Sequence, residues 1–154
     1  MRIREATPED AAAACDVMRR SIAELCIADH GNDQAILGKW LSNKTPEAFR
    51  SWIRPGNSVL VAIENDDILA VGCVTDSGEI TLNYVSPDAR FRGASSVLLA
   101  GLEKRALARG NKTCTLESTK TALRFYLARG YSERGSAGGK FGTTSGRPMS
   151  KRLI

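Results

Sequence analysis

The sequence has few residues of the types that bind metal ions, and it has no long apolar run. Its one histidine is His30, and its four cysteines form no Cys-x-x-Cys pair: Cys15, Cys26, Cys73 and Cys114. We therefore expect no metal site, buried free thiols, and a loop or surface position for His30. No apolar run approaches the roughly 20 residues of a membrane helix, and the charged N-terminus does not resemble a signal peptide. These absences predict a cytoplasmic protein with no membrane contact.

The size and composition are those of one ordinary folded domain. The chain has 154 residues, of which 42% are hydrophobic and 25% are charged, so we expect a single domain over residues 1–154. The charge is uneven, with a balance of −5 in residues 1–86 and +10 in residues 87–154. A basic half suits a polyanionic ligand and an acidic half suits a cationic one, although a solvated surface can be asymmetric by chance.

The first half of the chain predicts one strand, several helices and then a hairpin. A short strand is expected over residues 2–6, and helical segments follow over residues 8–20, 21–42 and from 46 to before Pro55. Two β-type runs cover residues 58–63 and 68–75, and the polar turn Asn65-Asp66-Asp67 between them predicts an antiparallel hairpin.

The second half alternates strands and helices. A strand over 79–85 is expected to place Ile80, Leu82 and Tyr84 on one face, and apolar residues at 3–4 spacing predict a helix over 94–109. Further elements are a strand over 113–117, a helix ending at Gly130, strands over 131–134 and 148–154, and a glycine-rich mobile loop over 136–146. This order predicts an α/β fold whose mixed sheet contains a right-handed parallel crossover.

The strongest chemical feature lies where strand 79–85 leads into helix 94–109. The sequence there is Arg90-Phe91-Arg92-Gly93-Ala94-Ser95-Ser96. A helix start leaves backbone N–H groups unpaired and carries partial positive charge, and small residues let a phosphate approach it closely. The segment therefore favours an anion site over an ordinary loop, although it is neither a P-loop nor a Gly-x-Gly-x-x-Gly motif.

The motifs of this region resemble those of the GNAT superfamily of N-acetyltransferases. The resemblance is carried by Arg90-x-x-Gly93-x-Ser95 and by Ala122-x-x-Phe125-Tyr126-x-x-x-Gly130-Tyr131, and it is weak over residues 20–57. It implies a mostly antiparallel mixed sheet with a central parallel β-α-β crossover and helices on both faces. It also implies an acyl-CoA-binding core over residues 79–131 and acceptor-side helices over residues 20–57.

The same resemblance implies the residues that hold acetyl-CoA. The pyrophosphate would bind to the loop residues Arg90, Phe91, Arg92, Gly93, Ala94, Ser95 and Ser96, although Ser95 departs from the Gly or Ala typical of the family. Asn83, Tyr84 and Val85 would pair with the pantetheine arm. Thr119 stands where many relatives have a CoA-contacting asparagine.

The resemblance also implies catalytic residues. Tyr126 matches the tyrosine that can protonate the departing thiolate, a role that a phenol of high pKa can perform; packing in the core is the alternative. Glu79 begins the central strand, where some relatives carry a base glutamate, but an exposed turn residue is equally consistent with its position. Tyr84 and a water chain are the other candidates for the base.

Together these features predict an acetyl-CoA-dependent N-acetyltransferase that acylates a primary amine directly. The acceptor would bind between residues 20–57 and 136–146, and the acidic balance of residues 1–86 favours a cationic acceptor. One alternative is a non-catalytic module that senses acyl-CoA. We expect no nucleic-acid partner, because the basic half has no recognition motif, and a homodimer is consistent with the family.

Overall fold

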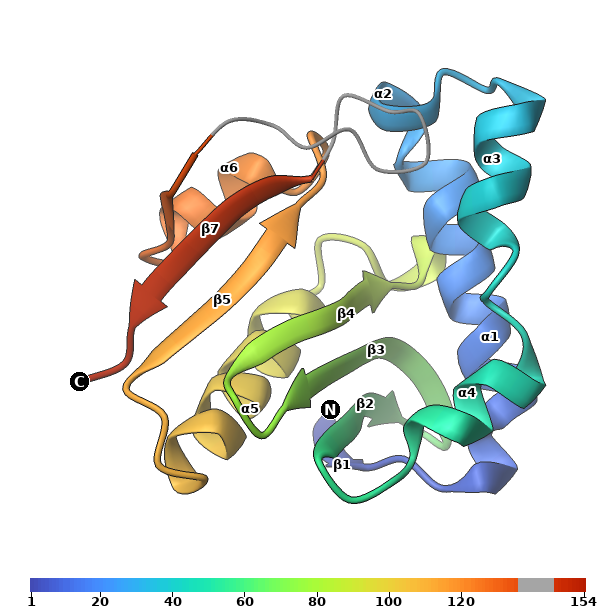
Figure 1. Cartoon of the computed structure of the whole chain (residues 1–154). Coiled ribbons are helices and arrows are strands. Elements are labelled where there is room, and N and C mark those ends of the chain that lie inside the picture. Colours follow the sequence, from blue (N-terminus) through green and yellow to red (C-terminus); the bar gives the residue numbers. More distant parts are fainter. Residues whose placement is uncertain (136–145) are drawn as a thin grey trace.

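The computed structural model describes residues 1–135 and 146–154. The described residues form one seven-stranded sheet in the order β1-β2-β3-β4-β5-β7-β6 (Figure 1). Its strands are β1 (Arg2–Glu5), β2 (Asn57–Glu64), β3 (Asp67–Thr75), β4 (Glu79–Val85), β5 (Thr113–Ser118), β6 (Ser132–Glu133) and β7 (Arg147–Arg152). The β4–β5 pair is parallel and the other neighbours are antiparallel, which confirms the predicted mixed sheet. The predicted loop 136–146 falls almost wholly outside the described residues.

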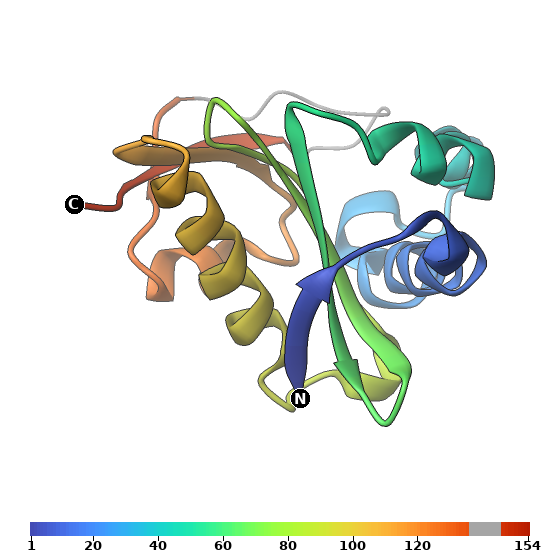
Figure 2. The same ribbon diagram turned by 90° about the horizontal axis from the view of Figure 1, so that it is seen from below.

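Helices cover both faces of this sheet (Figure 2). One face carries α1 (Ala11–Arg20), α3 (Gln34–Leu41) and α4 (Pro46–Trp52), with the 3₁₀ turn η1 (Pro8–Asp10), the π-helical turn η2 (Ser21–Leu25) and the short α2 (Ile27–His30) beside them. The other face carries α5 (Ala94–Ala108) and α6 (Leu123–Ala128), and a 3₁₀ turn η3 (Pro87–Ala89) follows β4. No helix among the described residues is both long and apolar enough to span a bilayer.

Two apolar clusters hold the helices on the sheet. The α5 cluster includes Leu98 and Leu102, and the α1 cluster includes Met18 and Phe49. Close packing explains Gly72 in β3, since an added Cβ would lie 2.8 Å from Leu102 Cδ1. The four cysteines are buried and free, as the sequence predicted.

A β-bulge in β4 corrects the predicted alternation of that strand. Val74 of β3 pairs with Ile80 and Cys73 pairs with Leu82, so Thr81 is an extra residue in β4. Such an insertion reverses the face of every residue beyond it. Ile80 accordingly packs in the α5 cluster, whereas Leu82 and Tyr84 pack against the α1 cluster, and the prediction that all three share one face is wrong.

His30 is a second correction. Its side chain is 2% exposed rather than at the surface. The Asn32 N–H donates to His30 Nδ1 at 3.0 Å, and Nε2 lies 2.8 Å from the Ile22 carbonyl oxygen. The imidazole also packs edge-on against Trp40. These two contacts require the neutral tautomer with its proton on Nε2, so His30 is a structural residue that ties α2 to η2.

The two central strands of the sheet, β4 and β5, pair near their first residues and then separate. β4 and β5 pair only through Glu79 with Thr115 and Ile80 with Leu116, after which they diverge (Figure 1). The edge of β4 that faces β5 therefore has no strand partner beyond Ile80 among the described residues. Backbone N–H and C=O groups on such an edge are available to a ligand.

Candidate active site

A cavity of about 550 Å³ lies where β4 and β5 separate, beside the start of α5 and one side of α6. Most of the predicted donor-site residues line it: Asn83, Tyr84, Val85, Arg90, Phe91, Gly93, Ala94, Ser95, Ser96, Thr119 and Tyr126. We call it the donor cavity. Arg92 and Glu79 are not part of its wall, so the structure brings together all the predicted site residues except these two.

The start of α5 forms one end of the donor cavity. Gly93 precedes the helix with a φ of +86°, a left-handed conformation that favours glycine, and no side chain caps the helix there. The N–H groups of the first helical turn have no partners within the helix. Because the side chains at Ala94 and Ser95 are small, these N–H groups are accessible to an anion.

Three arginines lie near this helix start, and they differ in orientation. Arg92 forms an ion pair with Glu64 on the surface, at 2.6 Å, which explains its absence from the cavity wall. Arg90 lies over the ring of Phe91, which is 91% exposed and has a φ of +66°. Arg129 of the α6 region also lines the cavity, and its guanidinium donates to Ser96 Oγ, with Nε at 3.1 Å. Arg129 was not among the predicted site residues, although its position three residues after Tyr126 places both on one side of a helix.

Tyr126 of α6 also lines the donor cavity and is 6% exposed. Asn83 Nδ2 donates to its hydroxyl oxygen at 2.9 Å, so the phenolic proton is free to point elsewhere. Burial raises the pKa of Tyr126 to about 12, although the Asn83 contact lowers it in part. The phenol therefore stays protonated at neutral pH and can donate a hydrogen bond into the cavity.

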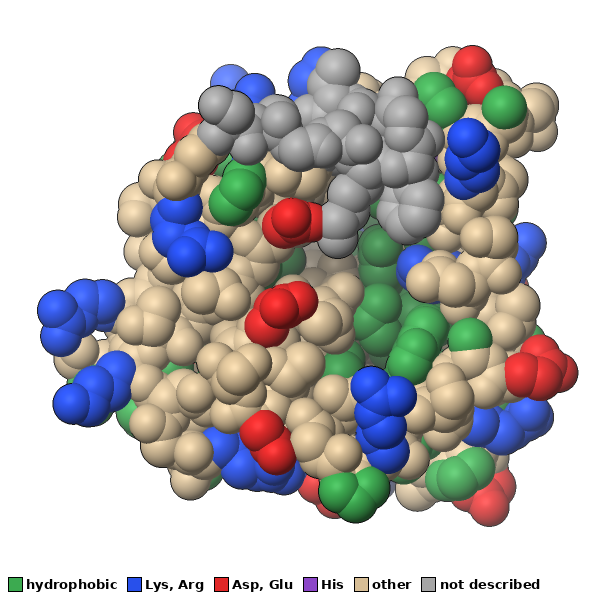
Figure 3. Space-filling model, in the orientation of Figure 1, with side chains coloured by type: hydrophobic (Ala, Val, Ile, Leu, Met, Phe, Trp, Pro, Cys, Tyr) green, Lys and Arg blue, Asp and Glu red, His purple; other side chains and the backbone are tan. Residues whose placement is uncertain are grey.

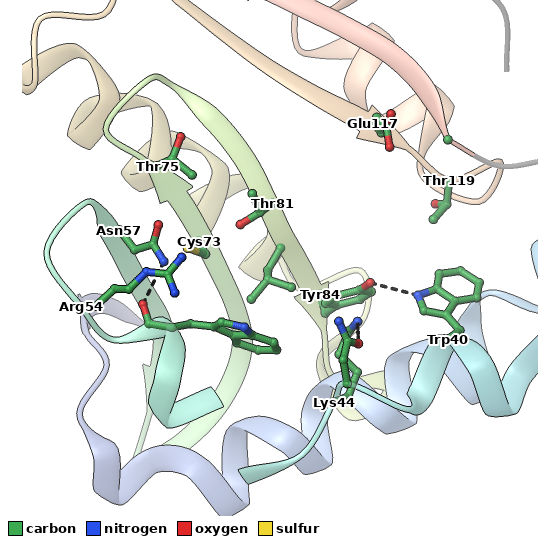
Figure 4. A pocket seen from close by; sticks show the side chains of 14 residues that line it. Trp40, Lys44, Arg54, Asn57, Cys73, Thr75, Thr81, Tyr84, Glu117 and Thr119 are labelled. Carbon is green, nitrogen blue, oxygen red and sulfur yellow. Dashed lines mark hydrogen bonds between the residues drawn. The ribbon is translucent and has the colours of Figure 1, made fainter. Parts of the chain in front are cut away.

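A second cavity of about 360 Å³ lies on the α3–α4 side of β4 (Figure 4). Figure 3 shows that this face is hollowed, with hydrophobic side chains on the floor of the hollow. Its wall includes Trp40, Lys44, Trp52, Arg54, Asn57, Cys73 and Thr75. We call it the acceptor cavity.

The two cavities share part of their walls. The shared residues are Thr81, Leu82, Tyr84, Glu117 and Thr119, so the cavities meet at the bulge of β4 and the end of β5. Tyr84 lies at this junction, and its hydroxyl accepts a hydrogen bond from Trp40 Nε1 at 3.3 Å. Burial raises the pKa of Tyr84 above its usual value.

The two glutamates near the sheet opening occupy different places. Glu79 is exposed at the start of β4, where its N–H donates to Thr75 Oγ1, and it lines neither cavity. Glu117 is exposed near the end of β5 and lines both cavities. Glu117 reaches the junction because β5 diverges from β4. No pattern in the sequence could therefore have identified it.

Asp29 fixes the segment that carries Thr119. Its buried carboxylate accepts hydrogen bonds from the Lys120 N–H at 2.7 Å, the Thr121 N–H at 3.3 Å and the Thr121 hydroxyl at 2.6 Å. Thr119 Oγ1 in turn accepts from the Ala122 N–H at 3.1 Å, just before α6. α2 and the start of α6 are thus joined across the junction of the cavities.

The described residues thus form an α/β fold whose sheet separates at its centre, where the two cavities meet. The chain belongs to the GNAT family of acetyltransferases: residues 26–153 match the family model described as "Acetyltransferase (GNAT) domain". This match confirms the resemblance found in the sequence. No curated protein matches the chain.

Solved structures show the same fold. The "GCN5-Related N-acetyltransferase: Aminotransferase, Class-II" from Rhodopseudomonas palustris is 26% identical with a TM-score of 0.88, covering 99% of this chain and 95% of that one. The PaiA N-acetyltransferase from Thermoplasma acidophilum, solved with coenzyme A, is 19% identical with a TM-score of 0.85, covering 99% and 98%. A ribosomal-protein-alanine N-acetyltransferase from Brucella melitensis is 23% identical with a TM-score of 0.75, covering 99% and 100%.

Proposed function

We propose that this enzyme transfers the acetyl group of acetyl-CoA directly to a primary amine. The observation that carries the proposal is the junction of the two cavities at the bulge of β4. A thioester in the donor cavity and an amine in the acceptor cavity would meet there without a covalent enzyme intermediate. Holding two reactants in contact removes much of the entropic cost of a bimolecular reaction.

The donor cavity supplies contacts for both parts of coenzyme A. The pyrophosphate would bind to the N–H groups at the start of α5, with Arg90 and Arg129 on the same wall. The pantetheine arm would pair with the free edge of β4 at Asn83–Val85, as an added strand does. The structural relative from Thermoplasma acidophilum was solved with coenzyme A, which supports coenzyme A as the ligand of this fold.

The reaction itself needs one attack and two proton transfers. The neutral amine nitrogen attacks the thioester carbonyl carbon, and a backbone N–H of β4 stabilises the oxyanion. The C–S bond then breaks, and the sulfur receives a proton from Tyr126 as coenzyme A leaves as a thiol. The attacking nitrogen loses a proton, so that an N-acetylated amine forms.

Glu117 is the carboxylate best placed to accept the amine proton, directly or through water. It lines both cavities, whereas Glu79 lies outside them. Tyr84 also lies at the junction, but burial raises its pKa, so its phenol is a poor base at neutral pH. We therefore propose Glu117, rather than the predicted Glu79, as the general base.

The predicted cationic acceptor rested on the acidic balance of residues 1–86, and that balance does not describe the acceptor cavity. Several acids of this half form ion pairs with arginines away from the cavity: Asp10 with Arg4, Glu64 with Arg92, Glu5 with Arg105 and Asp76 with Arg109. The cavity wall instead carries Lys44 and Arg54, with Glu117 as its described carboxylate.

Thermal unfolding with and without acetyl-CoA tests the proposal first. A ligand that binds only the folded state at 100 times its Kd adds about 2.7 kcal/mol of stability, so we expect a clear rise in Tm. A panel of primary amines with detection of the released thiol should then identify an acceptor. Absence of stabilisation by acetyl-CoA would contradict the proposed function.

A further inference from the structure

We infer that the acceptor amine carries an anionic group, such as a carboxylate, and that Arg54 binds it, while Lys44 adds positive charge to the wall of the same cavity. The inference rests on the proposed function, because it concerns the substrate of the same site. It replaces the cationic acceptor that the charge balance predicted.

Arg54 supplies the first positive charge. It lies two residues after the end of α4, and its side chain lies along the cavity wall beside Asn57 (Figure 4). No hydrogen bond or ion pair joins its guanidinium to another residue in the described part of the chain. This differs from the arginines that pair with carboxylates on the surface, such as Arg4 with Asp10. The planar guanidinium is well suited to bind a carboxylate through two parallel hydrogen bonds.

Lys44 supplies the second positive charge and is 4% exposed. Its segment is held in place by Arg19, which donates to the carbonyl oxygens of Leu41 and Lys44 at 3.0 and 3.2 Å. The ammonium donates to Asn43 Oδ1 at 2.6 Å and lies 6.0 Å from the centre of the Tyr84 ring. The ammonium adds positive charge to the wall of the acceptor cavity, which attracts an anionic ligand there.

The position of Glu117 indicates how an acceptor would be oriented in the acceptor cavity. It comes from β5, on the side of the cavity away from Arg54 (Figure 4), and it lies at the junction with the donor cavity. An acceptor with its anionic group at Arg54 can therefore place its amine near Glu117 and the thioester. A diamine would place one of its positive charges beside Arg54, where like charges repel.

The size of the cavity fits a small acceptor or the end of a longer one. Its volume of about 360 Å³ lies at the lower end of the range for ligand sites. Trp40 and Trp52 add apolar surface to the wall, which would contact the carbon skeleton between the two charged ends. The chemical class is thus an amino acid or another amine that bears an acidic group.

Matched substrates test this class directly. We would measure kcat/KM by thiol release for the common α-amino acids and a series of ω-amino acids, for the carboxamide of each, and for diamines of the same chain lengths. The carboxamide keeps the shape of the acid and removes only its charge. We expect at least one acid to exceed its carboxamide by about tenfold or more, as one charge-assisted contact allows, and to exceed every diamine.

Variants of Arg54 connect that preference to the cavity. Arg54→Gln should lower the ratio of acid to carboxamide kcat/KM about tenfold, mainly by raising KM for the acid, and Arg54→Lys should retain part of the preference. Arg50→Gln is the matched control: Arg50 is exposed on α4 and outside the cavity wall, so this variant should keep the ratio.

The outcomes separate this inference from the proposed function. Carboxamides or diamines that are acetylated as well as every acid would overturn the inference and leave the acetyltransferase intact. An unchanged acid preference in Arg54→Gln would overturn the assignment to this cavity wall. If acetyl-CoA does not bind and no amine of any charge is acetylated, the proposed function itself fails.

Discussion

The donor and acceptor cavities share residues but are built from different groups. The donor cavity offers two sets of unpaired backbone groups, the N–H groups at the start of α5 and the free edge of β4, beside the side chains of Arg90, Arg129 and Tyr126. The acceptor cavity offers mainly side chains, including Trp40, Lys44 and Arg54. Backbone contacts depend on the fold, whereas side-chain contacts change with each substitution. Because of this difference, substitutions in the acceptor cavity can change which amine binds while the fold continues to bind the same acyl donor.

The largest expected effect comes from Tyr126→Phe, at the donor side of the junction. If Tyr126 protonates the leaving thiolate, kcat should fall about 100-fold, a typical contribution of a general acid, while the Kd for acetyl-CoA changes less than about threefold. Stopped-time thiol assays and calorimetry measure the two quantities. Unchanged turnover would show that Tyr126 only packs in the core. If neither the wild type nor Tyr126→Phe acetylates any amine, although both bind acetyl-CoA, the alternative of a non-catalytic acyl-CoA sensor is favoured.

Tyr131→Phe is the matched control for that variant. Tyr131 is also buried, it packs edge-on against Tyr126 with ring centres 5.5 Å apart, and its hydroxyl donates to Glu103 outside the donor cavity. Loss of this hydroxyl should affect stability and leave kcat largely intact. Equal losses of kcat in both variants would indicate a packing effect.

The next largest effect tests whether the pyrophosphate of acetyl-CoA binds to the backbone N–H groups at the start of α5. Ser95→Glu places a carboxylate in the first turn of α5, which the helix tolerates well, but the charge would repel the pyrophosphate. We expect the Kd for acetyl-CoA to rise about 30-fold by Coulomb repulsion at short range, with little change in Tm. Ser95→Gln is the uncharged control and should bind acetyl-CoA nearly as tightly as the wild type does. If Ser95→Glu and Ser95→Gln bind acetyl-CoA with similar affinity, the pyrophosphate does not bind at the start of α5.

A smaller effect distinguishes the two glutamates. Glu117→Gln should lower kcat/KM about tenfold near pH 7, less than the full contribution of a general base, because water can still accept the amine proton. Glu79→Gln should lower it much less, since Glu79 lies outside both cavities. The pH profile of kcat/KM for the two variants measures this difference, and a larger loss for Glu79→Gln would reverse the assignment.

The smallest effect concerns stability at alkaline pH. Burial raises the pKa of Tyr126 and of Cys26, both in the donor cavity, to about 12, above unfolded values of about 10 and 8.5. The unfolded chain therefore releases these protons first as the pH rises. The free energy of unfolding should fall between about pH 9 and 12, by up to about 1.4 kcal/mol per pH unit for each group. Urea denaturation at several pH values checks this, and Cys26→Ala should flatten the slope near pH 9.

The sequence predicted the donor cavity better than the acceptor cavity, and the reason is physical. The segment Arg90–Ser96 lies at one strand-to-helix turn, so its chemistry is visible locally, and Tyr126 lies in a motif of its own. Glu117 and Arg54 are far apart in the sequence, and only the tertiary structure places both in the wall of the acceptor cavity. The bulge at Thr81 reversed the expected side of Ile80, because alternation along a sequence cannot show an inserted residue. His30 was misplaced because a polar residue next to glycine predicts a turn, while its two hydrogen bonds bury it.

The most direct test of direct transfer at the junction is an initial-velocity measurement. Thiol release would be followed while acetyl-CoA and the best amine of the panel are varied together. If both substrates occupy their cavities at once, release should require the amine, and the double-reciprocal lines should intersect. Parallel lines, which indicate a covalent acetyl-enzyme, or thiol release that does not depend on the amine would contradict the account.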